Sequence, residues 1–351
     1  MELFSNTTTV AQKSTIQDNF SLEVTVLGVI RGVISLFGII GNSLTIRTFV
    51  AMGLKDGVTL SFLFLSISDL LYLTSMLAST VSYIFLSVEL LRKYSIYFPI
   101  DPYGVNIYFL NCGSGLYLNT TLTITFLSIA RCLSVAKPLW FRNASGKLKI
   151  TIIFMIISSS ICVALSIPTL ALMGIIPKAD SKINGTRPTL WISPLRKLIT
   201  AITWPIGGSV IPFSVQFILI FCIGVMTFYL KKALQFREKF TQATTLKTTD
   251  ENESTENEKV EANKSVKLKG RELQIVKQML IISLVFVTCN IPKISVNTTI
   301  FLVPEYSIDG AYGKLYEAFD MVRNTFQVIN SSSNIFVYYK YNSRFRKLFW
   351  K

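Results

Sequence analysis

Long apolar stretches separated by short polar connections dominate the hydrophobic pattern of this chain. Seven such segments are evident, and each is long enough to cross a bilayer as a helix, which takes about 20 apolar residues. They cover roughly residues 24–50, 59–87, 105–134, 148–174, 197–234, 271–302 and 315–338. The pattern predicts an all-α membrane protein, built as a bundle of seven transmembrane helices.

The last segment carries polar residues at a helical spacing. Between Glu317 and Tyr338 they recur at steps of three and four, which places them on one face of an α-helix. They are Asp320, Arg323, Gln327, Asn330, Ser331, Asn334 and Tyr338. Because unpaired polar groups are costly in lipid, we expect this stripe to face other helices or water inside the bundle.

The composition agrees with a membrane protein and excludes several classes of site. Half of the 351 residues are hydrophobic and 16% are charged, whereas about a quarter of the residues in soluble domains are charged. The chain has no histidine, and its five cysteines form no CxxC pair, which excludes histidine catalysis and argues against a cysteine zinc site or a disulfide framework. With no nucleophile–base pair or phosphate-binding loop evident, we expect a protein that is not an enzyme.

The net charge of +15 is concentrated in particular connections. Basic residues without acidic ones follow the third segment and Tyr338, and basic residues flank the long polar connection 235–270. The positive-inside rule then predicts a plasma-membrane protein with an extracellular N-terminus and a cytoplasmic C-terminus. This distribution gives no reason to expect nucleic-acid binding.

The predicted organisation follows from this topology. Residues 1–23 form an extracellular tail and 24–338 the transmembrane domain, with a disordered cytoplasmic loop at about 235–270. Residues 339–351 form a short amphipathic C-terminal helix whose apolar side chains, Phe345 among them, lie on the membrane. Three glycosylation sequons fall on the predicted outer side, at Asn6, Asn19 and Asn184.

Short motifs recur in order along the segments. Gly41-Asn42-Ser43-Leu44 is similar to GNxL, and Leu65 to Leu70, with Asp69, is similar to LxxxD. Further along stand Ala130-Arg131-Cys132 in place of DRY, Phe286 to Pro292 in place of FxxCWxP, and Asn334 to Tyr338 in place of NPxxY. With this spacing the chain resembles a divergent rhodopsin-like (class A) G-protein-coupled receptor.

Asp69 is a lone carboxylate inside an apolar run, and leaving it unpaired in lipid costs several kcal/mol. Its predicted partners are Asn42, Thr120, Asn330, Ser331 and Asn334. The resemblance implies that this cluster forms a pocket for an allosteric sodium ion, and no other cofactor is expected. A polar network that only holds the helices together is the alternative.

The resemblance also implies an activation switch. Arg131 pairs with an acid when the receptor is inactive and contacts the G protein when it is active. The neighbouring acid is replaced by Ala130, so Glu272 is the remaining partner. Phe286, Pro292 and Tyr338 complete the residues expected in the switch and the G-protein contact. The ion pair that holds the inactive state, here called the lock, lacks the acid at position 130 and is therefore weakened, which predicts high ligand-free signalling.

A ligand site is expected in the outer half of the bundle. Asn290, Lys293 and Asn297 share one helical face, and Asp320, Arg323 and Gln327 share another. An intramembrane lysine is costly unless it faces water, a partner or a ligand, so Lys293 and Arg323 favour an anionic ligand. Lys293 pairing with Asp320 or Glu317 is the alternative. The resemblance adds two inward-facing positions of the third segment, Gly113 and Tyr117.

The sequence therefore predicts a receptor that binds an extracellular chemosensory cue or neuropeptide and activates a heterotrimeric G protein. The glycine at 113 argues against a monoamine ligand, since amine receptors carry an aspartate there. Membrane lipids are the other expected partner. Two alternatives stay open: a seven-span ligand-gated channel or transporter, and a decoy receptor that binds ligand without signalling.

Overall fold

The structure of the protein is a computed structural model that describes most of the chain. The described backbone comprises residues 2–54, 56–90, 97–136, 148–180, 185–247, 256–303, 305–306 and 310–350. Within these ranges the side chains are described except at 2–24, 90, 180, 233, 234, 236–247 and 256–272. The expected glycosylation sites Asn6, Asn19 and Asn184 lie outside the described side chains.

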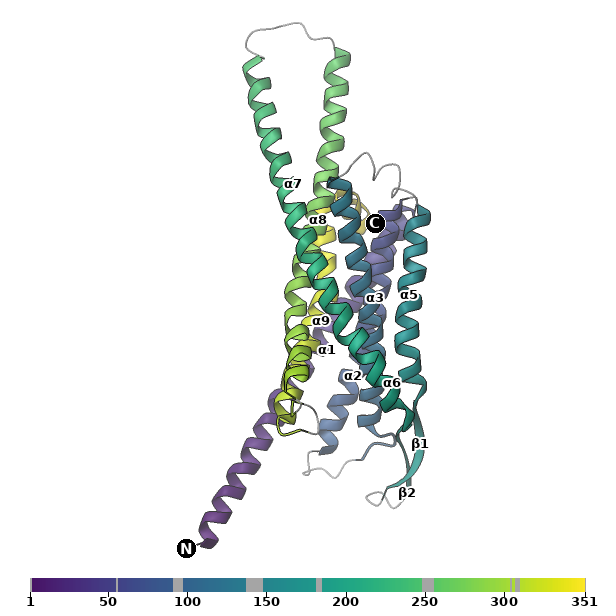
Figure 1. Ribbon diagram of the computed structural model, residues 1–351, viewed down its shortest axis with the longest axis vertical. Helices are drawn as coiled ribbons and strands as arrows, with labels where there is room; N and C mark the ends of the chain where they lie inside the picture. The colour runs from purple at the N-terminus through teal and green to yellow at the C-terminus, as the bar shows by residue number, and fades with distance from the viewer. Residues whose placement is uncertain are drawn as a thin grey trace.

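Helices make up almost the whole of this part of the chain (Figure 1). The long helices are α1 (Glu2–Met52), α2 (Gly57–Leu90), α3 (Pro102–Ala136), α5 (Leu148–Ala171), α7 (Ile211–Lys247), α8 (Glu256–Leu302) and α9 (Gly313–Tyr341). Two shorter elements, α6 (Leu195–Trp204) and the π-helical turn η1 (Pro205–Val210), run directly into α7. A last helix, α10 (Ser343–Phe349), lies where a short C-terminal helix was predicted.

Six of the described helical spans are long and apolar enough to cross a membrane. They are Thr25–Met52, Gly57–Glu89, Pro102–Ala136, Leu148–Ala171, Leu195–Lys232 and Leu273–Leu302. These six confirm the first six predicted segments and make the chain a multi-pass membrane protein. The seventh segment forms helix α9, whose polar stripe makes it less apolar than these six spans.

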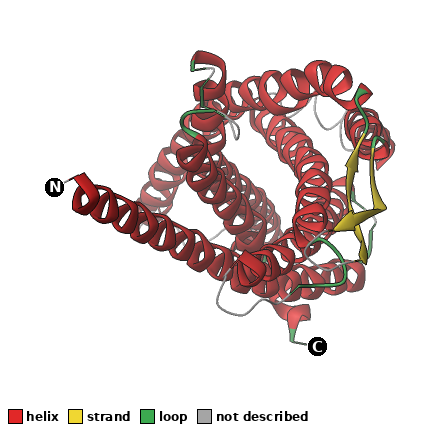
Figure 2. Cartoon of the chain, turned by 90° about the horizontal axis from the view of Figure 1, so that it is seen from below, coloured by secondary structure: helices red, strands yellow, loops and turns green. Residues whose placement is uncertain are grey.

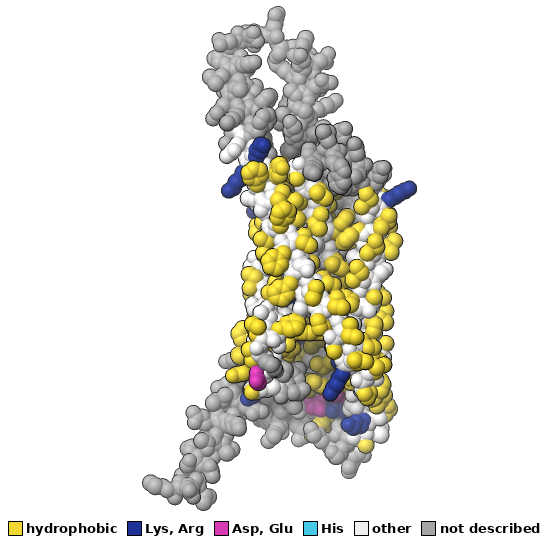
Figure 3. Space-filling model, viewed as in Figure 1, with side chains coloured by type: hydrophobic (Ala, Val, Ile, Leu, Met, Phe, Trp, Pro, Cys, Tyr) yellow, Lys and Arg dark blue, Asp and Glu magenta, His cyan; other side chains and the backbone are white. Residues whose placement is uncertain are grey.

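The helices form a ring when the bundle is seen along its axis (Figure 2). α2 packs between α1 and α3, α3 also contacts α5, α7 and α8, and α9 closes the bundle against α1, α2 and α8. Apolar side chains cover the middle of the outer face, while lysine and arginine gather towards its two ends (Figure 3). Phe217 and Phe221 are among the exposed apolar residues of α7, as expected for a surface that lipid covers.

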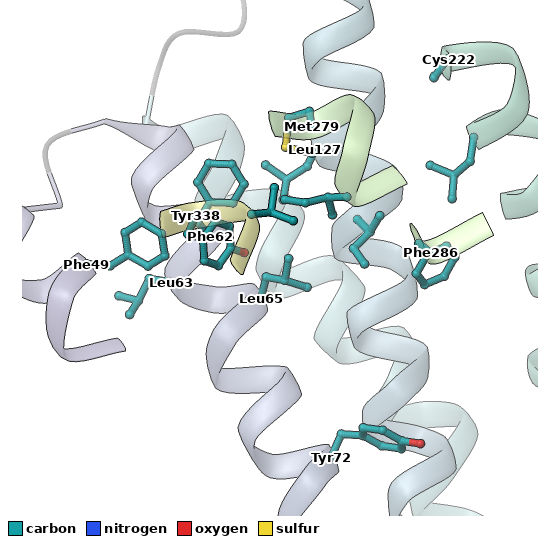
Figure 4. Close-up of a cluster of buried hydrophobic side chains, with 14 of the residues drawn as sticks. Phe49, Phe62, Leu63, Leu65, Tyr72, Leu127, Cys222, Met279, Phe286 and Tyr338 are labelled. Carbon is teal, nitrogen blue, oxygen red and sulfur yellow. The ribbon is translucent and has the colours of Figure 1, made fainter. Parts of the chain in front are cut away.

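An aromatic cluster fills the bundle at the end that carries α10 (Figure 4). The Tyr338 ring of α9 lies 5.2 Å from Phe49 of α1 and 5.1 Å from Phe62 of α2, between ring centroids. Phe345 of α10 completes the cluster, 5.2 Å from Phe49, and is fully buried. The prediction that Phe345 lies on the membrane is therefore wrong: α10 turns this ring into the core, where aromatic neighbours bury it.

Two strands at the opposite end were not predicted. β1 (Met173–Asp180) and β2 (Gly185–Ile192) pair antiparallel, with Met173 opposite Ile192, and they lie at the edge of the ring (Figure 2). The fourth apolar segment, predicted to reach residue 174, ends as a helix at Ala171 because the chain turns into β1 there. We call β1 and β2 the hairpin, and the end of the bundle that carries them the hairpin end.

An ion pair fastens the hairpin to α2. Arg187 of β2 donates to both carboxylate oxygens of Glu89, each at 2.7 Å, and to the Ile100 carbonyl at 3.3 Å. The two charged side chains are only 6% and 12% exposed. All five cysteines are free, so a buried ion pair, and not a disulfide, holds this loop in place.

Helices enter two regions where the sequence predicted none. α1 begins at Glu2, inside the predicted tail 1–23, and α7 and α8 extend to Lys247 and from Glu256, inside the predicted disordered loop 235–270. Lysine and glutamate are common in the loop and are good helix formers, so its low hydrophobicity did not exclude a helix there.

Candidate functional site

A fully buried carboxylate lies at the centre of the bundle. Asp69 of α2 accepts a hydrogen bond from Thr120 Oγ1 of α3 at 3.0 Å and another from Asn334 Nδ2 of α9 at 2.8 Å. Ser331 of α9, also fully buried, lies beside the same carboxylate. The predicted contacts of Asp69 with α3 and α9 are therefore present, and three helices meet on one side chain.

Two of the predicted partners, Asn42 and Asn330, form no hydrogen bond with Asp69 among the described residues. Asn42 Nδ2 donates to the carbonyl oxygens of Gly38 at 2.9 Å and Ser331 at 3.0 Å. The predicted bond from Asn42 to Asp69 is therefore wrong, because the amide reaches back along α1 and across to the α9 backbone. Asn330 is buried, and its Nδ2 has no hydrogen-bond partner among the described residues.

Lys293 of α8 occupies the hairpin-end half of the bundle. Its ammonium lies 5.2 Å from the centroid of the Tyr117 ring, a cation–π distance. The alternative pairings are absent, since Asp320 pairs with Arg323 and Glu317 accepts a hydrogen bond from Tyr83 at 3.4 Å. Among the described residues Lys293 thus has an aromatic ring beside it and no carboxylate within ion-pair distance.

Tyr117 joins the predicted ligand residues of α3, α8 and α9. Its hydroxyl lies 3.2 Å from Asn290 Oδ1 and 3.0 Å from Asn290 Nδ2, within hydrogen-bonding distance of both. Its ring lies 5.0 Å from Tyr72, whose hydroxyl donates to Gln327 Oε1 at 3.4 Å. The structure thus brings Tyr117, Asn290, Lys293 and Gln327 together, and it adds Tyr72, which was not predicted.

The other four predicted ligand residues are already engaged. Arg323 forms an ion pair with Asp320, one turn earlier on α9. Asn297 donates through Nδ2 to the Gly208 carbonyl of η1. Gly113 packs against α2, where an added Cβ would lie 3.0 Å from Met76 Sδ. The contacts of Asn297 and Gly113 join α8 to η1 and α3 to α2, so these two residues serve helix packing here.

Arg31 is the site residue that the sequence analysis missed. It lies within the first apolar span and is only 1% exposed. Its Nε donates to Thr80 Oγ1 of α2 at 2.9 Å, and its Nη1 lies 3.3 Å from Met321 Sδ of α9. An arginine inside the apolar run of α1 was the available signal, by the same argument that singled out Asp69 and Lys293.

The predicted switch residues do not form one cluster. Arg131 of α3, with Ala130, lines a cavity of about 290 Å³ between α2, α3 and α5, while Tyr338 packs in the aromatic cluster with α1, α2 and α10. The Glu272 side chain lies outside the described part of the chain.

Two further switch residues belong to α8. Phe286 is buried, with its ring stacked on Tyr117 at 6.3 Å between centroids, and Figure 4 shows it apart from the Tyr338 cluster. Pro292 lies inside α8 and directly precedes Lys293. Phe286 therefore connects the Tyr117 group to the core, since both rings touch across the α3–α8 contact.

No protein-family model matches this chain, and a search of curated proteins found no match. The structure by itself establishes a helical, multi-pass membrane protein with a buried carboxylate network and, nearer the hairpin end, a partly paired set of cations. What these two groups do is argued from their chemistry below.

Proposed function

We propose that the protein is a seven-helix receptor of the rhodopsin-like class. An extracellular ligand with negative charge binds among Lys293, Tyr117, Asn290 and Gln327 at the hairpin end. Binding shifts the population of helix arrangements, and a heterotrimeric G protein contacts the end that carries Arg131. In this proposal α9 crosses the membrane as the seventh helix, with the N-terminus outside and α10 in the cytoplasm.

The observation that carries the proposal is the convergence on Asp69. Asp69 and Asn334 were singled out by motifs in different segments, and Asn334 bonds this carboxylate, as does Thr120, its predicted partner in the third segment. Asn42, from a third motif, donates a hydrogen bond to the backbone carbonyl of Ser331 in α9. Residues chosen by their place in the motifs thus meet in space, which supports a receptor with a central polar network.

The deciding experiment measures nucleotide exchange. The chain is purified in detergent micelles and mixed with Gα subunits of each class and their βγ partner, with and without a series of carboxylate ligands. Faster exchange on one Gα class supports the receptor. Ligand binding without exchange on any class favours a decoy, and ligand-gated current in membranes that lack G proteins favours a channel.

The residues around Asp69 fit the sodium ion that the receptor class implies. The carboxylate, the hydroxyls of Thr120 and Ser331 and the Asn334 amide oxygen are the oxygen donors that a hard cation prefers. The bound ion supplies a positive charge opposite the buried carboxylate, which stabilises the packed, inactive arrangement of α2, α3 and α9.

Asp69→Asn is expected to remove sensitivity to sodium. In the wild-type protein, replacing potassium by sodium at constant ionic strength lowers ligand-free nucleotide exchange, by about fivefold or more for a typical coupling between sites. The variant keeps a side chain of the same shape but loses the charge that holds the ion. Exchange assayed in the two salts decides, with Thr74→Ala, an exposed change in α2, as the control. Equal sodium sensitivity in Asp69→Asn would refute the ion site.

Ala130→Asp is expected to lower ligand-free exchange. An aspartate there gives Arg131 a neighbouring carboxylate at the α10 end of α3, which favours the inactive arrangement. A reduction of about fivefold corresponds to roughly 1 kcal/mol of coupling. The same substitution at Ala136, six residues along the helix, is the matched control. The idea of a weakened lock fails if Ala130→Asp and the wild-type protein have the same basal rate.

A further inference from the structure

Arg31 is a charged side chain that the proposed ligand site does not use. It lies six residues after Thr25, where the first apolar span begins, which is roughly 9 Å along the helix. Nε and Nη1 have the contacts to Thr80 and Met321 described above, but Nη2 has no hydrogen-bond partner among the described residues and is itself buried. One edge of this guanidinium is therefore unsatisfied.

The charges around Arg31 do not balance. The carboxylate that acts on it electrostatically is that of Asp320, and Asp320 is held by Arg323 and by Asn324 Nδ2 at 2.8 Å. Lys293, across the bundle, has no carboxylate partner in the described part of the chain. Among the described residues of the hairpin-end half, Asp320 thus pairs with Arg323 and Glu317 bonds Tyr83, while no carboxylate pairs with Arg31 or Lys293.

Unbalanced charge in an apolar interior is costly. An arginine or lysine at the centre of a membrane helix costs several kcal/mol unless a partner or water compensates it, and buried cations are usually paired or hydrogen-bonded. A helix bundle that keeps two uncompensated cations therefore favours any anion that reaches them. Arginine in particular offers paired N–H donors that match the two oxygens of a carboxylate.

The two unpaired cations are separated by aromatic rings. Arg31 lies among α1, α2 and α9, and Lys293 lies over Tyr117 of α3. Between them stand Tyr72 and Tyr117, with centroids 5.0 Å apart, and Tyr72 is within electrostatic reach of Arg31. A single small anion cannot contact both cations across two rings, so each one defines a separate anion-binding position.

We infer that Arg31 is a second anion-binding subsite, and that the ligand is an elongated molecule with an anionic group at each end. One group binds the guanidinium edge of Arg31 between α1, α2 and α9, and the other binds the Lys293 ammonium. The middle of the ligand lies against the faces of Tyr72 and Tyr117. This inference rests on the proposed ligand site at Lys293 and adds the class of ligand.

The experiment measures binding without any G protein, so a failure to signal does not affect it. Purified full-length protein in detergent micelles is titrated with straight-chain α,ω-dicarboxylates of four to ten carbons and with monocarboxylates of the same lengths. Potassium chloride keeps the ionic strength constant. Affinity is obtained by fitting the rise of Tm with ligand concentration to a stabilisation of RT ln(1 + [L]/Kd).

For the wild-type protein we expect at least one dicarboxylate to bind about tenfold more tightly than its monocarboxylate. In Arg31→Gln the dicarboxylate affinity falls to that of the monocarboxylate, and the monocarboxylate affinity stays within about twofold. Arg31→Lys keeps the positive charge and retains part of the preference. If Arg31→Gln does not fold, Thr80→Val replaces it, because this variant removes a contact of Arg31 but no charge. It reduces the preference for dicarboxylates and leaves monocarboxylate binding unchanged.

The possible outcomes separate the two proposals. A preference for dicarboxylates that survives in Arg31→Gln, or in Thr80→Val if the former does not fold, overturns the Arg31 subsite alone. Binding of monocarboxylates with no preference for any dicarboxylate in the wild-type protein overturns it as well, and leaves Lys293 as a single anion site. If folded wild-type protein binds no member of either series, both the subsite and the anionic ligand are wrong.

Discussion

Arg187→Ala accelerates amide hydrogen exchange across the hairpin by about 100-fold or more. Truncation leaves the Glu89 carboxylate buried without its cation, and removing one partner of a buried ion pair costs about 3–5 kcal/mol. Each 1.4 kcal/mol corresponds to a factor of ten in the opening equilibrium that exchange reports. The measurement is hydrogen exchange with mass spectrometry on peptides that cover Gly185–Ile192, in the purified protein.

The control for this experiment lies on the same hairpin. Lys178 of β1 is the cross-strand partner of Arg187 and is exposed, so Lys178→Ala removes a positive charge without breaking the buried pair. Its effect should stay within about 0.5 kcal/mol. The double variant Arg187→Ala, Glu89→Ala should exchange more slowly than the sum of the single effects predicts. Equal exchange in Arg187→Ala and the wild-type protein means that other contacts hold the hairpin.

In the proposed receptor, Lys293→Gln lowers the potency of a carboxylate agonist by about 100-fold. Glutamine has a similar reach and keeps hydrogen-bonding capacity but has no charge to meet the anion, and removing one partner of a buried charge pair costs about 2–5 kcal/mol. Because the lysine has no carboxylate partner among the described residues, the substitution does not orphan an acid of the protein. Potency is read from agonist-dependent nucleotide exchange, with the most potent carboxylate of the series.

Two companion variants separate charge from shape. Lys293→Arg keeps the charge and should retain most of the potency, while Lys340→Gln removes an exposed lysine at the α10 end of α9 and should change nothing. Surface expression of all variants is compared by labelling intact cells. Full potency in Lys293→Gln would exclude this lysine from the ligand site.

The helical part of the fold was accessible from the sequence because membrane-spanning helices have a simple signature. Apolar runs of sufficient length predicted six spans that the structure confirms, and the spacing of polar residues predicted helix α9 and the inward face that carries Asn334. The contact of Asp69 with Thr120 followed from a single argument, since a carboxylate in a dry interior needs donors.

Contacts between distant segments were not accessible in the same way. Glu89 and Arg187 are 98 residues apart, and no sequence pattern around either residue indicates the other as its partner. The ion pair forms only when the hairpin folds onto α2. The hairpin itself is short, and its strands follow directly on an apolar helix, where hydropathy does not separate strand from helix.

Within the candidate site the sequence was a better guide to charge than to partners. It singled out Lys293 and Arg323 because a charged side chain is costly inside a membrane. The Arg323–Asp320 ion pair and the contact of Lys293 with the Tyr117 ring depend on side-chain directions, which the sequence does not show. Arg31 is also a charged side chain inside an apolar span. Its role became apparent from its burial against α2 and α9.

The polarity of α9 has a consequence for how the protein is made. Insertion of an aspartate or arginine at the centre of a membrane helix costs about 2.5–3.5 kcal/mol each, and α9 carries both, with buried asparagine, serine and glutamine residues besides. In the proposed receptor, α9 therefore partitions poorly into lipid as an isolated segment during synthesis at the translocon. We expect it to enter the bilayer against α1, α2 and α8, so that biogenesis of the last span depends on assembly of the earlier ones.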